Sequence, residues 1–233
     1  QVTGYESASK YGAIFWMGQD GALSYDPTGI QVFQQLGNGD SLSETFNYTV
    51  TNKFSVSKNA TVKITIKGVD DAPIINTTDI ADAVEDQAYF NDYNATDVEI
   101  ADVFTWSLHS NASFLSIDLG TGALSGTPTN DNVGKFYVNV SVGDGHGKFD
   151  FSNFTLTVAN VNDIPLWVDV PEDTEIVANT RYKFDANATD IDIGDHLTYS
   201  IASIPASSIS IDAVSGLINW TPTTAGEYDI NLA

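Results

Sequence analysis

The side chains of this sequence that could do chemistry are almost all acidic. The 233 residues include 31 Asp and Glu against nine Lys and Arg, with three His and no Cys. Without thiolates, and with so few imidazoles, any bound metal must be a hard cation that prefers oxygen ligands. The formal charge of -22 repels phosphate backbones and anionic lipids, so nucleic-acid binding is excluded.

The His residues and the carboxylates do not form a recognisable catalytic motif. His109, His146 and His196 lie in separate predicted loops, and none neighbours a Ser and an acid in a nucleophile motif. Carboxylate pairs for glycoside hydrolysis can always be drawn from 31 acids, so they are uninformative. We therefore expect no enzyme. Among the three, we single out only His146, which lies near Asp144 between two glycines.

The acids belong to a chain that repeats itself. The segment NATDVEIADVFTWSL from Asn94 returns as NATDIDIGDHLTYSI from Asn187, a shift of 93 residues. GALSGTPT from Gly122 returns as GLINWTPT from Gly216, and a third copy, GALSYDPT, begins at Gly21. The sequence therefore contains about 2.5 copies of a unit of roughly 93 residues.

Proline-containing linkers predict the domain boundaries. VDDAP ends at Pro73 and VNDIP ends at Pro165, 92 residues later. We therefore expect three domains. They are 1–73, which lacks its opening strands, 74–165, which is complete, and 166–233, which lacks its last strand.

The incomplete domains leave two interpretations open. In the first, the missing strand belongs to a continuation of the same chain. In the second, the Tyr228–Leu232 edge of one copy accepts the Gln1–Tyr11 segment of the next, which would build a filament.

Hydrophobic and polar residues alternate along most of the chain. The alternation predicts half-buried antiparallel strands separated by Gly, Asp, Asn and Pro turns, at residues 62–66, 136–142, 154–158 and 182–188. About seven short strands per repeat indicate an all-β fold of tandem antiparallel β-sandwiches. No apolar run approaches 18 residues, so we expect no membrane span within this segment.

Two stretches resemble known families. Residues 74–233, with NATDIDIGDHLTYSI and SISIDAVSGLINWTPTTAGEYDINL, resemble dystroglycan-type cadherin-like repeats. Residues 13–73, with QDGALSYDPTG and VDDAP, resemble the second half of a VCBS repeat, although Asp70 stands where the shared NDxP linker usually has Asn. The resemblance implies immunoglobulin-like and cadherin-like sandwiches in an adhesion or stalk protein at the cell surface.

The cadherin resemblance also implies calcium. In the loop where cadherins carry DxD ligands, this sequence has Asp190, Asp192 and Asp195, and Asp97, Glu99 and Asp102 repeat the spacing. The other ligands it implies lie in the linkers, in the GDGHG hairpin and on a first strand, and are Asp70, Asp71, Asn162, Asp163, Asp144, Glu85 and Asp86. Calcium takes six to eight oxygen ligands, and loops of this kind can supply them.

The distribution of charge favours calcium over a second interpretation, in which Asp is merely a turn residue. Residues 1–73 carry a net charge of -2, residues 74–165 carry -11 and residues 166–233 carry -9. Acid is therefore concentrated in the cadherin-like part. Carboxylates without cationic partners repel one another, and a divalent ion would reverse that repulsion.

Acceptor motifs for N-linked glycans are frequent. The nine Asn-x-Ser/Thr sites are Asn47, Asn59, Asn76, Asn94, Asn111, Asn139, Asn153, Asn187 and Asn219. Composition alone would produce about three such sites. Strand phase predicts that Asn47, Asn139, Asn153 and Asn187 face solvent. Heavy N-glycosylation would place the protein outside the cell.

The leading functional prediction is an extracellular structural or adhesive stalk. Its partners would be other surface proteins, glycans or copies of itself. The alternatives are the filament subunit described above and a carbohydrate-binding module. For the module, Trp16, Trp106, Trp167 and Trp220 could form a sugar-stacking face, but the alignment of Trp106 with Tyr199 on a strand favours core packing.

Overall fold

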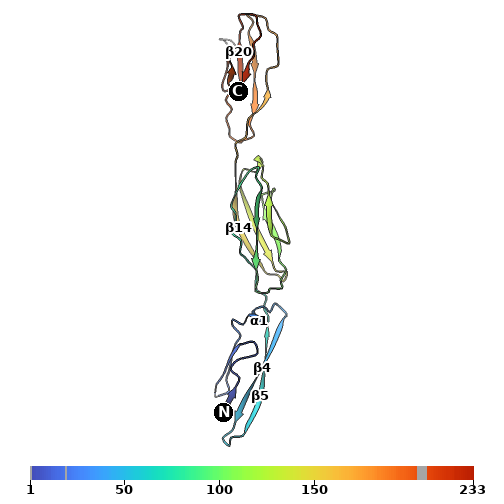
Figure 1. Ribbon diagram of the computed structural model, residues 1–233, viewed down its shortest axis with the longest axis vertical. Helices are drawn as coiled ribbons and strands as arrows, with labels where there is room; N and C mark the ends of the chain where they lie inside the picture. The colour runs from blue at the N-terminus through green and yellow to red at the C-terminus, as the bar shows by residue number, and fades with distance from the viewer. Residues whose placement is uncertain (1, 19, 204–208) are drawn as a thin grey trace. The chain divides into compact units, whose positions relative to one another are not determined.

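The computed structural model describes residues 2–18, 20–203 and 209–233. Regular structure in these residues is almost entirely β-strand (Figure 1). The chain forms two compact units, and each is described by itself. Unit 1 comprises Gln1–Ala83, Gln87–Pro128 and Gly134–Val158, and unit 2 comprises Val84–Asp86, Thr129–Val133 and Ala159–Ala233.

The first part of unit 1 is built from two small sheets. One has the order β1-β4-β5, with β1 at Val2–Tyr5, β4 at Ser41–Thr51 and β5 at Ser57–Lys67. The other is the hairpin of β2, Ile14–Met17, and β3, Leu23–Asp26. Phe15 and Phe46 stack between the sheets with ring centroids 3.9 Å apart. The one-turn helix α1, Gln31–Gln34, was not predicted because four residues are too few to show a helical period.

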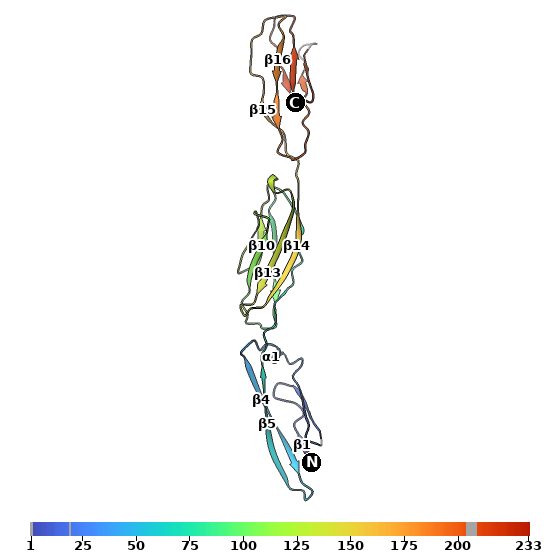
Figure 2. The same ribbon diagram turned by 180° about the vertical axis from the view of Figure 1, so that it is seen from behind.

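The rest of unit 1 is a fuller sandwich. One sheet has the order β10-β13-β14-β7, with β10 at Thr105–Ser110, β13 at Gly134–Gly143, β14 at Phe149–Ala159 and β7 at Asp82–Val84 (Figure 2). The second sheet, β11-β12-β8, comprises Ser116–Ile117, Ala123–Gly126 and Tyr89–Asp92. A short pair joins β6, Ile74–Ile75, to β9, Ala95–Thr96.

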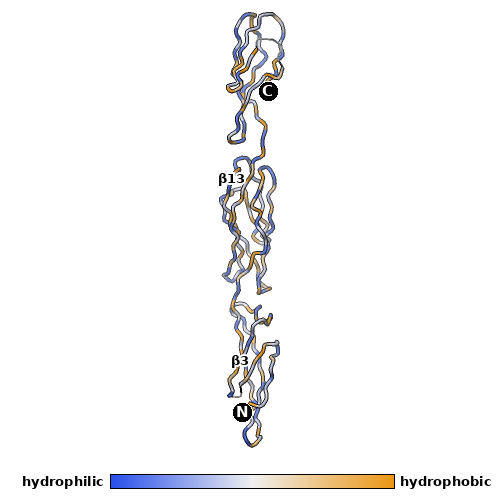
Figure 3. The backbone as a smooth tube through the Cα atoms, turned by 90° about the vertical axis from the view of Figure 1, so that its left-hand side faces the viewer, coloured by the Kyte–Doolittle hydropathy of each residue, from blue (hydrophilic) through white to orange (hydrophobic). Residues whose placement is uncertain are grey.

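The period of two explains why these residues form strands. Along β13, Val138, Val140 and Val142 are buried, while the residues between them include the more exposed Asn139. On the neighbouring β14, Leu156 is buried and packs into the same core. The alternation of hydrophilic and hydrophobic residues along the backbone is visible in Figure 3. Each buried side chain removes apolar surface from water, which stabilises the sheet pairing.

Unit 2 repeats this plan in shorter strands. It contains the sheet β16-β20-β19, at Tyr182–Asp185, Leu217–Trp220 and Ser210–Ile211. Two pairs accompany it, β15-β17 at Leu166–Asp169 and Asn187–Thr189, and β18-β21 at Ile201–Ser203 and Asn231–Leu232. The 3-10 turn η1 spans Asn130–Asn132. Ala186, Ile209, Ile218 and Trp220 form the core.

Some details differ from the sequence analysis. Trp106 and Trp220 are core residues, as predicted, but Trp16 and Trp167 are exposed. The segment proposed as a donor in strand exchange is already paired through β1 and β4, and its first residue, Gln1, lies outside the described residues. Among the described residues, no helix has the length and apolar character needed to cross a membrane.

Candidate metal sites

The two acidic loops predicted from the repeat fold locally in similar ways. In unit 1 the loop after β9 turns as the Asp102 N–H donates to the Glu99 carbonyl at 3.1 Å. In unit 2 the loop after β17 turns as the Asp195 N–H donates to the Asp192 carbonyl at 3.3 Å. Both loops hold several carboxylates within one short turn, and the protein must place these charges close together.

In unit 1 the carboxylates gather into two groups that share a residue. Asp97, Asp102 and Asp144 each offer a ligand atom within 4.8 Å of the others. Asp70, Asp102 and His146 form a second group, whose ligand atoms also lie within 4.8 Å of one another. Asp102 therefore lies between two possible cation positions.

The oxygens of these groups are buried and incompletely satisfied. Asp144 is 1% exposed, and its Oδ2 accepts no hydrogen bond. In the same two groups and the nearby Glu99, further buried oxygens without hydrogen-bond partners are Asp70 Oδ1, Asp97 Oδ2, Asp102 Oδ2 and both oxygens of Glu99. A buried carboxylate oxygen without a partner is costly. A bound cation would offset that cost.

The electrostatics of unit 1 reflect the crowding. Burial, followed by the nearby charge of Asp144, raises the pKa of Asp70. Burial also raises the pKa of Glu99, and its neighbours Asp97 and Asp71 add to the shift. At both side chains, burial and neighbouring acidic groups disfavour the charged form of the carboxyl group.

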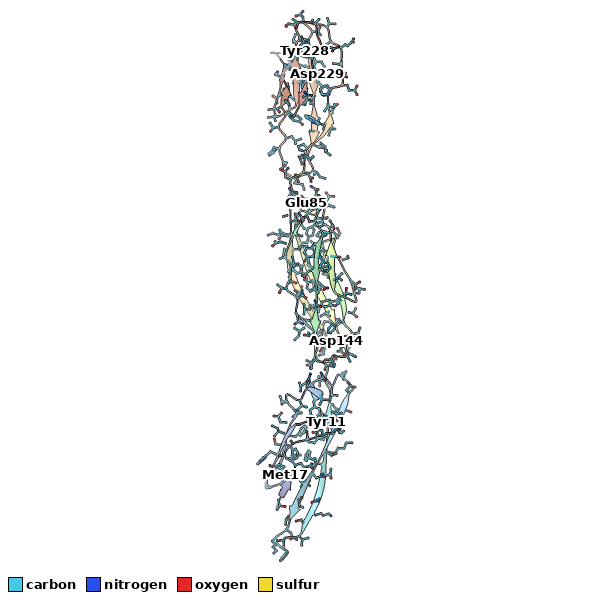
Figure 4. All side chains as sticks on the ribbon, viewed as in Figure 1. Tyr11, Met17, Glu85, Asp144, Tyr228 and Asp229 are labelled. Atoms are coloured by element: carbon cyan, nitrogen blue, oxygen red, sulfur yellow. The ribbon has the colours of Figure 1, made fainter. Side chains whose placement is uncertain are left out.

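Asp144 has a different role because its other oxygen organises a turn. Oδ1 of Asp144 accepts backbone hydrogen bonds from His146, Gly147 and Lys148 at 2.6, 2.9 and 3.1 Å. Burial would raise the pKa of Asp144, but these three donors outweigh it and the pKa is lowered. The turn lies between β13 and β14, and its three donors favour the ionised form of Asp144, which is labelled in Figure 4.

Unit 2 contains two groups that also share a residue. The first is Glu85, Asp163 and Asp192, and the second is Asp190, Asp192 and Asp195, each with ligand atoms within 4.8 Å of one another. Glu85, labelled in Figure 4, is fully buried. Its Oε1 accepts a short hydrogen bond from the Val161 N–H, while Oε2 has no partner.

Four predicted ligands lie outside these groups. Glu99 is buried beside the unit 1 cluster, whereas Asp71 and Asp86 are exposed. Asp86 also has the left-handed backbone angle φ of 59°, and Asn162 donates its amide to the Asp163 carbonyl at 2.7 Å. Conversely, a ligand role for His146 was not predicted, although its position two residues after Asp144 in a glycine-rich turn was a usable signal.

The chemistry of the donors suits a hard divalent cation. Three of the four groups found in the described part of the chain contain only carboxylates, and carboxylates are the preferred ligands of Ca²⁺ in flexible loops. In each unit the ligands come from segments that are distant in the sequence. A cation would therefore cross-link those segments.

The glycan acceptor residues lie mostly on the surface. Seven of the nine Asn residues are exposed, and Asn139 and Asn219 are half-buried. Asn139 lies directly across from Asn153 and donates its amide to the Asn153 Oδ1 at 2.6 Å. Strand phase predicted that Asn139 faces solvent, and the residue is half-buried with a partner for its side-chain nitrogen.

Comparison with solved structures identifies cadherin repeats as similar folds. The chain is 16% identical to mouse cadherin-23 EC22-24 over 89% of this chain and 71% of that chain, with a TM-score of 0.52. It is 12% identical to protocadherin gamma B2 extracellular cadherin domains 1-5 over 100% of this chain and 49% of that chain, with a TM-score of 0.52. The chain is 13% identical to the protocadherin gammaB7 EC3-6 cis-dimer structure over 100% of this chain and 62% of that chain, with a TM-score of 0.46.

At such low identities these likenesses describe the fold alone. The chain spans less than two thirds of the length of these two protocadherin chains. No curated protein sequence matches the chain. The family described as "Putative Ig domain" matches residues 72–159 and 165–233, more than half of the chain. The chain is therefore a member of this immunoglobulin-like domain family, and it contains two copies of the domain.

Proposed function

We propose that the chain is a segment of an extracellular structural or adhesive protein whose tandem sandwiches are cross-linked by Ca²⁺. The observation that carries this proposal is the set of buried carboxylate oxygens without hydrogen-bond partners in both units. Such oxygens destabilise a protein in the absence of a counter-ion. They become ligands when a hard divalent cation is present.

The clearest case is the group of Glu85, Asp163 and Asp192. Glu85 follows β7, Asp163 lies in the segment before β15, and Asp192 lies in the loop after β17. One Ca²⁺ bound by all three would tie the segment before β15 to the loop after β17 and to the residue that follows β7. Movement of the segment would then stretch several metal–oxygen bonds at once, so the ion would stiffen the chain.

The test is to unfold the chain with chelator and with about 1 mM Ca²⁺, which is at the upper end of the dissociation constants of extracellular calcium modules. We expect Ca²⁺ to raise the melting temperature and to reduce the flexibility measured by small-angle X-ray scattering. A melting temperature and a scattering profile that do not respond to chelator would refute the proposal.

We propose that residues 74–233 are dystroglycan-type cadherin-like repeats and that residues 13–73, which lie almost entirely outside the family match, are part of a VCBS-type repeat. Support comes from the internal repeat and the two Pro linkers at Pro73 and Pro165. Other surface proteins, glycans or further copies of this chain are its proposed partners. A filament built by strand exchange is a weaker alternative, because β1 is already paired with β4. Electron microscopy of native material distinguishes fibres from separate chains.

We also propose that most of the nine acceptor Asn residues carry N-linked glycans. This proposal is supported by the exposure of seven of these residues, at positions where a sugar can be attached without unfolding the sheet. Glycans on exposed strands would also block pairing with other chains. Intact mass spectrometry of the native protein tests this, because an unmodified chain has a mass of 25.0 kDa.

A carbohydrate-binding module is a second candidate function for unit 2. Trp167 is 42% exposed, and its ring lies 6.0 Å from that of Tyr199. Trp167 also lines a cavity of about 410 Å³ together with Asn162 and Asp190. An exposed aromatic ring beside polar groups can stack on a sugar. Glycan-array binding that is lost in Trp167→Ala would favour this function over a purely structural one.

A further inference from the structure

We propose that the group of Asp70, Asp102 and His146 binds a divalent transition-metal ion such as Zn²⁺, next to the carboxylate groups that suit Ca²⁺. The inference deepens the proposed function, because it assigns a different class of cation to one of the four groups. It does not require that Ca²⁺ binds elsewhere. The chain would then carry one mixed nitrogen and oxygen site and several oxygen-only sites.

The geometry around His146 is close to that of a metal centre. Its Nδ1 lies 3.4 Å from Asp102 Oδ1 and 3.9 Å from Asp70 Oδ1. Two ligand atoms bound tetrahedrally to Zn²⁺ at about 2.05 Å each are separated by about 3.3 Å. The first distance matches this value, and the second would need a movement of about half an ångström. Such a movement is small for the exposed His146 side chain.

The donor set favours a transition metal at this position. Imidazole binds Zn²⁺ and the ions near it in the first transition row, whereas Ca²⁺ prefers oxygen alone. Two carboxylates and one neutral imidazole balance the charge of a divalent ion. Three protein ligands also leave a position for water, and the side chain of His146, which is 56% exposed, makes the group accessible from solvent.

Burial supplies the independent reason to expect a ligand. The side chains of Asp70 and Asp102 are only 8% and 7% exposed, and each has one oxygen without a hydrogen-bond partner. Asp144 Oδ2, buried and also without a partner, belongs to the adjoining group through Asp102. Buried carboxylate oxygens without partners favour the binding of a cation.

The turn that carries His146 is built to hold it in place. Gly145 and Gly147 have φ angles of 86° and 107°, which glycine adopts most readily, and Asp144 Oδ1 accepts the backbone N–H of His146. The corresponding groups of unit 2 contain no imidazole among the described residues, even though His196 follows Asp195. The mixed donor set is therefore specific to unit 1.

The competing interpretation is that protonated His146 itself serves as the counter-ion of the acidic cluster. In that case its imidazolium would pair with Asp102 and exclude a metal. The two interpretations predict opposite effects of removing His146. A lost ligand weakens Zn²⁺ binding, whereas a lost counter-ion leaves room for a cation and strengthens it.

The experiment titrates the full chain with Zn²⁺ in excess Ca²⁺ and follows the ring C–H signals of the three His residues by NMR. We expect only the His146 signals to shift, with saturation at one Zn²⁺ per chain. Co²⁺ in place of Zn²⁺ should produce a visible absorption band of a nitrogen and oxygen site. His146→Gln and His146→Ala should each weaken the affinity tenfold or more. The matched control His109→Gln, an exposed His on β10, should leave it unchanged.

Equal Zn²⁺ affinity in the wild type and both His146 variants would overturn the inference, as would stronger binding in the variants or equal shifts of all three His signals. The Ca²⁺ proposal is judged separately by the chelator-dependent melting temperature. Loss of that Ca²⁺ response with retained Zn²⁺ binding would refute only the proposed function. A retained Ca²⁺ response together with Zn²⁺ affinity that does not depend on His146 would refute only this inference.

Discussion

The backbone N–H of Asp163 donates a hydrogen bond to Oδ2 of Asp192 at 2.7 Å. This contact joins the segment that precedes β15 to the acidic loop that follows β17. It satisfies one oxygen of Asp192 and leaves Oδ1 buried without a partner. Asp192 is also the residue common to both groups of unit 2. Its side chain is therefore the most informative place to test cation binding.

Asp192→Asn should remove most of the Ca²⁺ response of unit 2. The amide can still accept the hydrogen bond from Asp163, so the variant keeps its local structure while losing a charged ligand. When Ca²⁺ is present at 100 times its dissociation constant, one bound ion adds about 2.7 kcal/mol to the free energy of unfolding. We expect this gain in the wild type and its loss in the variant, measured by urea unfolding.

The matched control is Asp185→Asn, which changes an exposed Asp on β16 outside the metal groups. It removes the same charge but should keep the full Ca²⁺ response. In chelator, Asp192→Asn should be no less stable than the wild type, because it relieves repulsion within the acidic loop. A Ca²⁺ response that survives in Asp192→Asn would argue against this residue as a ligand.

Glu85 and Asp86 provide a sharper comparison within one pair of neighbours. Glu85 is fully buried in the group with Asp163, whereas Asp86 is exposed in a left-handed turn. Glu85→Gln should therefore reduce the Ca²⁺-dependent rise in melting temperature, because one of the groups loses a buried ligand, and Asp86→Asn should leave that rise intact. Calorimetry in chelator and in Ca²⁺ measures both. Equal effects of the two substitutions would show that charge alone, and not the buried position, determines binding.

The strands and acidic loops of this protein could be predicted because both are local features of sequence. Alternation of apolar residues identified β13 and β14, and the repeated spacing of Asp190, Asp192 and Asp195 identified their loop. The loop turns through hydrogen bonds between near neighbours, such as the 3.0 Å bond from the Asp192 N–H to Asp190 Oδ1. Neither feature depends on distant parts of the chain.

The choice among individual ligands could not be predicted, because it depends on tertiary placement. Sequence could not distinguish Glu85 from Asp86, since only the fold buries one and exposes the other. The approach of His146 to Asp102 joins residues 44 positions apart through a turn whose direction sequence does not specify. For the same reason Trp16 and Trp167, aromatic residues expected in the core, lie on the surface.

Gly122→Ala should strongly destabilise the fuller sandwich of unit 1, which contains β8 and β10–β14. Gly122 has a φ of 81°, and an added Cβ would lie 2.6 Å from the Tyr93 carbonyl oxygen and 2.7 Å from the Trp106 ring. The left-handed angle and the overpacking together should cost about 2–5 kcal/mol of the free energy of unfolding. Gly120→Ala is the control, because its nearest atom lies 3.6 Å away in the flexible Asp118 side chain. Similar losses in both variants would contradict this account.

Asp118 and Asp212 make the same turn in two repeats. Oδ1 of Asp118 accepts the N–H groups of Gly120 and Thr121 at 3.0 and 2.7 Å. Oδ1 of Asp212 accepts those of Val214 and Ser215 at 3.1 and 2.8 Å. These donors favour the ionised carboxylates, and the pKa values of both Asp residues are lowered.

A lowered pKa in the folded state predicts a loss of stability in acid. Each carboxylate contributes stability above its unfolded pKa, and that contribution disappears as the pH falls through the lower pKa of the folded state. Asparagine at both positions can accept the same hydrogen bonds at every pH. The double variant Asp118→Asn/Asp212→Asn should therefore lose less free energy of unfolding than the wild type between about pH 5 and pH 3. Urea unfolding in chelator at several pH values measures this difference, with Asp92→Asn/Asp185→Asn on exposed strand positions as the control. If the control pair flattens the pH profile as much as the turn pair, general charge repulsion and not the turn hydrogen bonds explains the acid sensitivity.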